Sequence, residues 1–155
     1  MLDEVIKICS PDKGGVYIDC TFGGGGYSKK LLKFSKTKVI ALDRDEFIVN
    51  ISKKLQKKYP NRFSFHKKKF SEVDAIVGNK LVDAIIFDLG LSSFQLSDQA
   101  RAFSFDSKNH LNMEMGINNL SAYDVVNKLD KENLAKIIKI LGDEKDGKII
   151  ANKIY

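Results

Sequence analysis

The stretch that decides the fold runs Val16-Tyr17-Ile18-Asp19-Cys20-Thr21-Phe22-Gly23-Gly24-Gly25-Gly26-Tyr27-Ser28. Its first five residues are mostly apolar, which predicts a buried strand. The four glycines leave the main chain free to turn tightly and to approach a ligand closely. A helix is predicted from 27 to 34, and the N–H groups at its start suit an anionic group. The loop is not a strict dinucleotide fingerprint, because Ser28 occupies the third glycine position. It is not a P-loop either, because no Gly-Lys-Ser/Thr follows.

Short apolar runs alternate with helical patterns along the first part of the chain. Further strands are predicted at 38–42, 62–66 and 82–87, and helices at 46–59 and 71–77. This alternation builds βαβ units, so we expect an α/β fold with a Rossmann-like, mostly parallel sheet flanked by helices. Four strands are few for this fold class, so we expect an incomplete sheet in a chain that is cut short.

The pattern changes after residue 87. Residues 88–118 are rich in Ser, Asn, Asp and Gly without a sustained period, which predicts a long loop, and loops of that length are usually functional. Beyond it, Ser121 begins a capping box and Asp130 suits the N-cap of a second helix. A third helix is predicted at 143–154.

The composition is that of an ordinary soluble globular protein, with 155 residues, 43% of them hydrophobic and 30% charged. No apolar run approaches the roughly 20 residues of a membrane helix, and the N-terminus does not resemble a signal peptide. We therefore expect a cytoplasmic protein without a membrane partner. Cys9 and Cys20 lie far apart with no CxxC and no histidine nearby, so no metal site is expected.

The formal net charge of +6 suits a polyanionic partner. The run Lys67-Lys68-Lys69 is the candidate for contact with the negative charges of such a partner. The earlier lysines at 53–58 fit a solvated helix face equally well. Neither His66, within a predicted strand, nor His110, in the predicted loop, is a convincing catalytic base.

Two acidic residues follow predicted strands. Asp43 ends the second strand twenty positions after Gly23, the spacing at which a carboxylate reaches the hydroxyls of a ribose. Asp45 suits the N-cap of the next helix better. Asp88 follows the fourth strand, at the carboxyl edge where ligands bind in open α/β sheets. These features indicate a nucleoside-containing cofactor, without separating a nicotinamide dinucleotide from S-adenosylmethionine.

The chain closely resembles the RsmH/MraW methyltransferase family, which methylates the exocyclic N4 of a cytidine in small-subunit ribosomal RNA. The resemblance runs from about Leu2 to the C-terminus. It rests on five motifs: Gly15 to Ser28, Leu42-Asp-Arg-Asp, Asp88-Leu-Gly-Leu-Ser-Ser-Phe-Gln-Leu, Phe103-Ser-Phe and Leu111-Asn-Met-Glu-Met. It implies a class I methyltransferase core at 1–100, followed at 101–155 by the start of an inserted helical domain.

The resemblance also implies an S-adenosylmethionine cofactor and a small-subunit ribosomal RNA partner. The implied cofactor contacts are Gly25, Gly26, Tyr27, Asp43, Phe70, Asp88 and Gln95, and Asp88 is the candidate catalytic residue. Two other interpretations stay open: a non-catalytic, cofactor- or RNA-binding remnant of the family, and an NAD-dependent oxidoreductase.

The chain departs from the family pattern at several positions. Tyr27 stands where the glycine loop usually ends in histidine, and Ala102 replaces a usual glycine. Asn112 and Glu114 stand where the family has aspartate and arginine, which inverts the local charge. The segment before Met1 and about half of the family's length after Tyr155 are also expected to be missing.

Overall fold

The computed structural model describes residues 1–116 and 120–155. The chain divides into two compact units. The first comprises Met1–Phe94 and Met115–Ile117, and the second Gln95–Glu114 and Asn118–Tyr155. The domain boundary expected at residue 100 stays a prediction.

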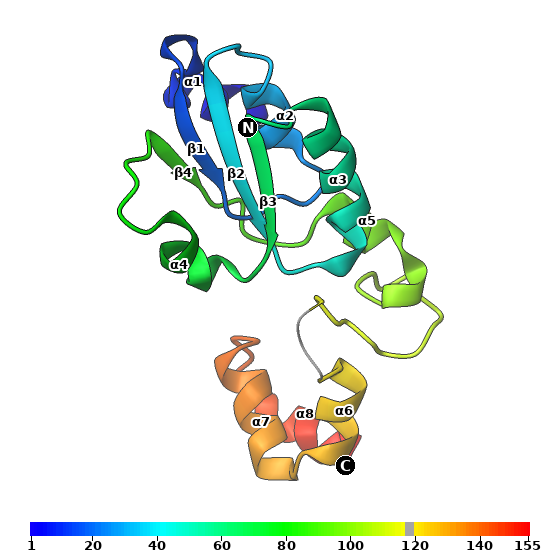
Figure 1. Ribbon diagram of the computed structural model, residues 1–155. Coiled ribbons are helices and arrows are strands. Elements are labelled where there is room, and N and C mark those ends of the chain that lie inside the picture. The colour runs from blue at the N-terminus through cyan, green and yellow to red at the C-terminus, as the bar shows by residue number, and fades with distance from the viewer. Residues whose placement is uncertain (117–119) are drawn as a thin grey trace. The chain divides into compact units, whose positions relative to one another are not determined.

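A four-stranded parallel sheet is the centre of the first unit (Figure 1). Its strands are β1 (Gly15–Asp19), β2 (Thr37–Asp43), β3 (Phe63–Lys67) and β4 (Ala84–Ile86), in the order β3-β2-β1-β4. β1 pairs with both β2 and β4, and β2 pairs with β3, all in parallel. The four predicted strands are confirmed, with ends that differ by up to two residues, and so is the Rossmann-like α/β fold.

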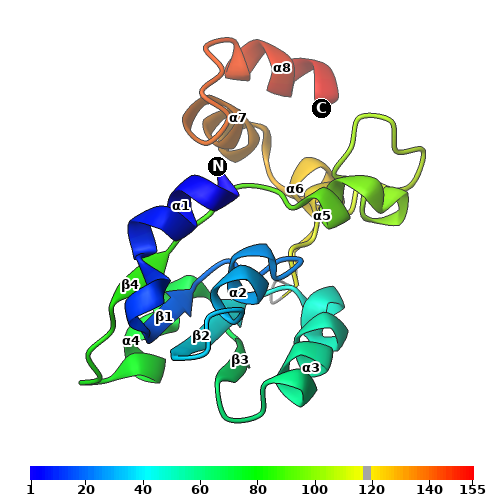
Figure 2. The same cartoon turned by 90° about the horizontal axis from the view of Figure 1, so that it is seen from above.

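Helices cover both faces of this sheet (Figures 1 and 2). They are α1 (Leu2–Cys9), α2 (Gly26–Leu31), α3 (Val49–Lys58) and α4 (Val73–Val77). Alternate strand residues enter separate cores, because side chains along a strand point to opposite faces. Tyr17 and Val39 pack with residues of α1, α2 and α3. Ile18 and Leu42 pack with residues of α4 instead.

The helices of the first unit begin and end at other residues than the sequence pattern predicts. The helix predicted at 27–34 ends at Leu31. A 3₁₀ turn at Glu46–Ile48 precedes α3, and another at Phe70–Glu72 precedes α4. Asp45 caps the first of these turns by accepting a hydrogen bond from the main-chain N–H of Phe47 at 3.1 Å, as expected. The sequence reasoning missed α1.

The prediction of an unbroken loop at 88–118 is wrong within the described residues. A short helix, α5 (Ser93–Ser97), and a 3₁₀ turn at Gln99–Arg101 interrupt it. Asp98 accepts a hydrogen bond from the main-chain N–H of Ala100 at 3.0 Å. Such local capping needs no periodic apolar pattern, which is why the sequence pattern did not reveal the turn. Residues 117 and 118 of the predicted loop lie outside the described residues.

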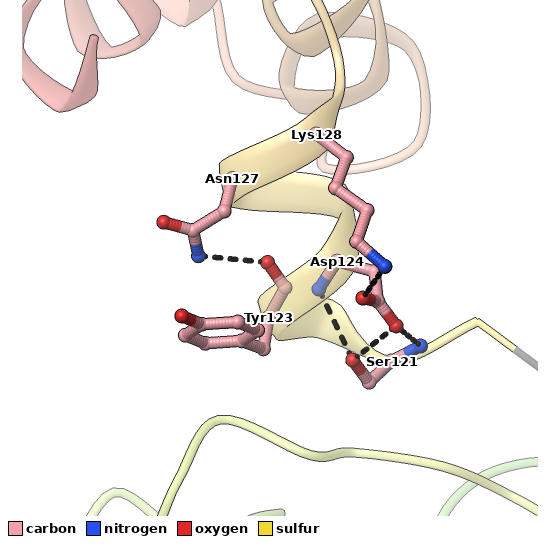
Figure 3. Close-up of polar contacts among 5 residues, drawn as sticks. All are labelled: Ser121, Tyr123, Asp124, Asn127 and Lys128. Atoms are coloured by element: carbon pink, nitrogen blue, oxygen red, sulfur yellow. Dashed lines mark hydrogen bonds and ion pairs between the residues drawn. The ribbon is translucent and has the colours of Figure 1, made fainter.

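Three helices form the rest of the second unit: α6 (Ala122–Lys128), α7 (Lys131–Ile140) and α8 (Gly147–Ile154). The capping box of α6 is confirmed (Figure 3), because Ser121 and Asp124 exchange hydrogen bonds of 3.0 and 3.1 Å. Asp130 caps α7 as expected, accepting from the main-chain N–H of Asn133 at 2.9 Å.

The third predicted helix begins four residues later than expected. Asp143 has a φ of 50°, and an L-residue in this left-handed conformation cannot continue an α-helix. The helix α8 therefore starts at Gly147, which packs closely against α7. A Cβ at Gly147 would lie 2.9 Å from the carbonyl oxygen of Ala135.

Among the helices that the structure describes, none combines the length and the apolar character that crossing a membrane requires.

Gly25→Ala should destabilise the protein by about 1–2 kcal/mol. Gly25 has a φ of 75°, which costs an L-residue about that much, and its Cβ would lie 2.8 Å from the buried ring of Phe22. Gly26→Ala is the matched control, since nothing lies within 4 Å of the Cβ position at Gly26. Urea denaturation would measure both variants, and equal stability of the two would contradict the strain at Gly25.

Candidate functional site

The chain from the end of β1 into the glycine-rich loop is held between the carboxyl ends of β2 and β4. The main-chain N–H of Phe22 donates to the carbonyl of Leu42 at 3.0 Å, and that of Cys20 to the carbonyl of Ile86 at 2.9 Å. Beyond β4, the main-chain N–H of Asp88 donates to Thr21 Oγ1 at 2.8 Å. Three segments distant in the sequence therefore meet at the carboxyl edge of the sheet, the usual location of ligand sites in such folds.

The loop itself is packed on one side and open at its end. A Cβ at Gly24 would lie 2.8 Å from the ring of Phe94, so only glycine lets these two segments approach so closely. At Gly26, the first residue of α2, a Cβ would meet nothing within 4 Å. The first N–H groups of a helix have no acceptor within the helix. The start of α2 therefore combines open space with main-chain donors.

The carboxylate of Asp43 faces this loop. Its Oδ2 accepts the main-chain N–H of Gly23 at 2.8 Å, and its Oδ1 accepts that of Asp45 at 2.9 Å. Burial raises the pKa of Asp43, and these two main-chain hydrogen bonds act in the opposite direction. Each carboxylate oxygen has a second acceptor position. The group is thus oriented by the main chain and can still receive two hydroxyl groups.

Asp19 is a site residue that the sequence reasoning did not single out. Its side chain is fully buried, and Oδ2 accepts a hydrogen bond of 2.6 Å from the Ser28 hydroxyl. Among the described residues, Oδ1 has no hydrogen-bond partner. Burial raises the pKa of Asp19 to about 6. The sequence does contain a signal for this site residue, since Asp19 is a charged residue at the carboxyl end of an otherwise apolar strand.

Phe70, Tyr27 and Asp88 belong to the same unit as this edge of the sheet, and Gln95 does not. Phe70 is half exposed and meets Phe87 edge to face, with ring centroids 5.8 Å apart. Burial raises the pKa of the half-buried Tyr27, and the negative charge of the exposed Asp88 carboxylate raises this pKa further. Gln95 is buried in α5 and belongs to the second unit.

Of the lysines predicted to contact RNA, Lys67 ends β3, and Lys68 and Lys69 follow it. Lys67 pairs with Glu46 at 3.5 Å and Lys68 with Glu72 at 2.7 Å. All four side chains are solvent-accessible, so these pairs are weak and can exchange with a phosphate.

Neither a histidine base nor a metal site is indicated among the residues that the structure describes. His66 lies on β3, where burial lowers its pKa, and His110 stacks edge to face on Tyr123. Across residues 1–116 and 120–155, no group of three or more His, Cys, Asp or Glu side chains is arranged to hold a metal ion.

A hollow of about 630 Å³ lies at the opposite, amino end of the strands. Its lining includes Val16, Lys38, Phe63 and Leu81, and none of the predicted site residues. In parallel α/β sheets ligands bind at the carboxyl ends of the strands. The carboxyl edge is therefore the better candidate site.

A family model described as the MraW methylase family matches residues 1–155. The chain belongs to this family. It is 39% identical over 159 residues to a protein of Ehrlichia ruminantium (strain Welgevonden), named ribosomal RNA small subunit methyltransferase H. A protein of Rickettsia africae (strain ESF-5) with the same name is 40% identical over 154 residues.

The alignments cover 99% of this chain but only 53% and 50% of those two relatives. The chain thus spans about half the length of the curated relatives it matches. The resemblance found in the sequence is confirmed at the level of the MraW methylase family.

The variant Asp19→Asn tests whether the raised pKa of the buried Asp19 carboxyl group makes the stability of the protein depend on pH. Its pKa is raised from 3.8 to about 6, so the folded protein binds this proton more tightly than the unfolded chain does. The contribution of Asp19 to stability is then greatest below about pH 4 and is lost as the pH rises to about 6. Relative to Asp19→Asn, the unmodified protein should lose up to about 3 kcal/mol of unfolding free energy between about pH 4 and pH 8.

Urea denaturation at several pH values would measure this difference. The exposed Asp12, replaced in Asp12→Asn, is the matched control. A stability difference between the protein and Asp19→Asn that stays constant with pH would show that Asp19 titrates normally.

Proposed function

We propose that this chain binds S-adenosylmethionine at the carboxyl edge of its sheet and acts in methyl transfer to the exocyclic N4 of a cytidine in small-subunit ribosomal RNA. The carrying observation is the 2.8 Å hydrogen bond from Gly23 N–H to Asp43 Oδ2. It makes the glycine loop and the acidic residue one continuous surface. Membership of the MraW methylase family and the names of the relatives support the same activity.

The residues at this edge fit such a cofactor. Main-chain groups of Gly25, Gly26 and Tyr27 would hold its methionine end, beside the open space at Gly26. Asp43 would accept the two ribose hydroxyls, since both of its oxygens keep an acceptor position. The half-exposed ring of Phe70 would lie against the adenine. The family resemblance adds Asp88 and Gln95.

When bound, the cofactor supplies a methyl group on a positively charged sulfur; the new N–C bond forms as the S–C bond breaks, and sulfur keeps the electron pair. The chain must orient the amine in line and accept the proton that the nitrogen loses. The exposed carboxylate of Asp88, fixed through its main-chain hydrogen bond to Thr21, is the proposed acceptor.

The target base would have to leave its stack to reach this edge. Lys67, Lys68 and Lys69 lie at the carboxyl end of β3 and directly after it, and they would contact the RNA backbone. The other interpretations are a remnant that keeps the cofactor or RNA surface without methyl transfer, and an NAD-dependent oxidoreductase. Titration with S-adenosylmethionine and NADH separates the oxidoreductase from the methyltransferase.

Calorimetric titration with S-adenosylmethionine and S-adenosylhomocysteine should show binding of both, and no binding of NADH. Asp43→Ala should weaken binding about tenfold or more, because two ribose hydroxyls lose their acceptor and the N–H of Gly23 is freed. Asp12→Ala, at an exposed site outside this edge, is the control. Binding of NADH alone would favour an oxidoreductase. A folded chain that binds neither S-adenosylmethionine nor S-adenosylhomocysteine would contradict the cofactor assignment.

Replacing Lys67, Lys68 and Lys69 together by alanine should weaken binding to small-subunit ribosomal RNA and flatten its salt dependence. Each lost phosphate contact lowers the slope of log K against log salt by about 0.7–0.9. The matched control replaces the exposed lysines of α3, Lys53, Lys54 and Lys57. Filter-binding assays at several salt concentrations measure both. An equal loss in the two triple variants would indicate general charge attraction instead of a site.

A further inference from the structure

The side chain of Lys29 folds back onto the glycine-rich loop. Lys29 is the fourth residue of α2, and its ammonium group donates a hydrogen bond of 2.6 Å to the main-chain carbonyl of Gly24. Its Cε lies 3.4 Å from the place that a Cβ would occupy at Gly25. Side chains on a helix lean toward its N-terminus, so a lysine in the first turn of α2 reaches the loop that precedes the helix.

The ammonium group of Lys29 keeps the capacity to bind an anion. An ammonium group has three N–H donors, and the Gly24 carbonyl takes one of them. Lys29 is exposed to solvent, and among the residues that the structure describes no carboxylate forms an ion pair with it. Its neighbour Lys30, by contrast, pairs with Asp3 at 2.8 Å. Lys29 can therefore hold the loop and an anionic group at the same time.

The segments that meet at this loop carry carboxylates. Asp43 is hydrogen-bonded to the loop at 2.8 Å, Asp19 ends β1, and the exposed Asp88 follows β4. An anionic group that enters this edge is repelled by these negative charges, most strongly where the surroundings are partly buried. The ammonium group of Lys29, bonded to the loop itself, supplies the positive charge that an anionic ligand needs here.

We propose that Lys29 binds the carboxylate of the methionine end of S-adenosylmethionine, and that it makes the site selective for adenosyl compounds with an amino-acid tail. This inference rests on the proposed function and deepens it. In that function the methionine end lies at Gly25 and Gly26, and the Lys29 side chain passes along the same part of the loop. The carboxylate is the one anionic group of the tail at neutral pH. The remaining N–H donors of Lys29 suit its two oxygens, and such charge-assisted hydrogen bonds are stronger than neutral ones.

Two ligands that differ in the tail test this assignment by calorimetry, without any activity. S-adenosylhomocysteine carries the amino-acid tail, whereas 5′-methylthioadenosine has the same adenosine and sulfur without the carboxylate. Lys29→Met keeps the length of the side chain and removes its charge. The variant should bind S-adenosylhomocysteine about three- to tenfold more weakly than the unmodified protein. Its affinity for 5′-methylthioadenosine should change by less than about twofold, since that ligand has no carboxylate for Lys29 to bind.

Two further variants serve as controls. Lys29→Arg should keep most of the affinity for S-adenosylhomocysteine, because a guanidinium group also pairs with a carboxylate. Lys33→Met removes the same charge from an exposed lysine farther along the chain and should leave both affinities unchanged.

The salt dependence of binding gives a second readout. Raising the NaCl concentration from about 0.05 M to about 0.5 M should weaken binding of S-adenosylhomocysteine to the unmodified protein, because salt screens the attraction between ammonium and carboxylate. The affinity of Lys29→Met should depend less on salt. Equal salt dependence of the two proteins would overturn the proposal.

The possible results separate this inference from the proposed function. An equal loss of affinity for the two ligands in Lys29→Met would overturn the role of Lys29, since it would show that the lysine acts only on the conformation of the loop. Unchanged affinity for S-adenosylhomocysteine with weaker binding to small-subunit ribosomal RNA would also overturn it and would indicate a phosphate contact. Neither result contradicts the proposed function. A folded, unmodified protein that binds neither S-adenosylmethionine nor S-adenosylhomocysteine would contradict that function, and the role of Lys29 with it.

Discussion

The hydrogen bond from the main-chain N–H of Gly23 to the Asp43 carboxylate joins the loop after β1 to the end of β2. Glycine has more accessible main-chain conformations than other residues, so a glycine-rich loop takes one defined conformation only where other contacts hold it. Here the main chain is held at Gly23 by Asp43, at Phe22 by the carbonyl of Leu42, and at Cys20 by the carbonyl of Ile86. The main-chain donors at the start of α2 have a defined position only because these bonds exist. The candidate site depends on them.

The same edge contains a buried carboxyl that costs stability at neutral pH. Asp19 has one oxygen bonded to Ser28 and another without a partner among the described residues, so its ionised form is poorly solvated. An apolar residue there would suit the core better. What the carboxyl provides is a directional link from the end of β1 to the first turn of α2, the turn that also presents Tyr27.

The site divides into two halves according to the strands that supply it. The end of β2 and the glycine loop present main-chain donors and the Asp43 carboxylate, which suit a nucleoside with an amino-acid tail. The segment after β4 presents the exposed Asp88. In the proposed function, cofactor binding and the acceptance of the proton therefore use separate side chains.

The amino-acid sequence alone determined the strands, their parallel arrangement and the family, because apolar runs, glycine clusters and capping residues act over short distances. Asp45, Ser121 and Asp130 cap as expected since a cap needs only a few neighbouring residues. The short helix α5 was missed because no periodic pattern announces a helix of five residues. The cofactor role of Gln95 stays a prediction, since this residue belongs to the second unit.

Only the tertiary structure decided which polar groups meet. Asp43 reaches Gly23 across 20 positions and Asp88 reaches Thr21 across 67, separations that no local pattern encodes. The burial of Asp19, and with it the raised pKa, likewise depends on α2 packing over the end of β1. The physical reason is that hydrogen bonds and desolvation depend on distances in space, while the sequence pattern specifies the elements that create those distances.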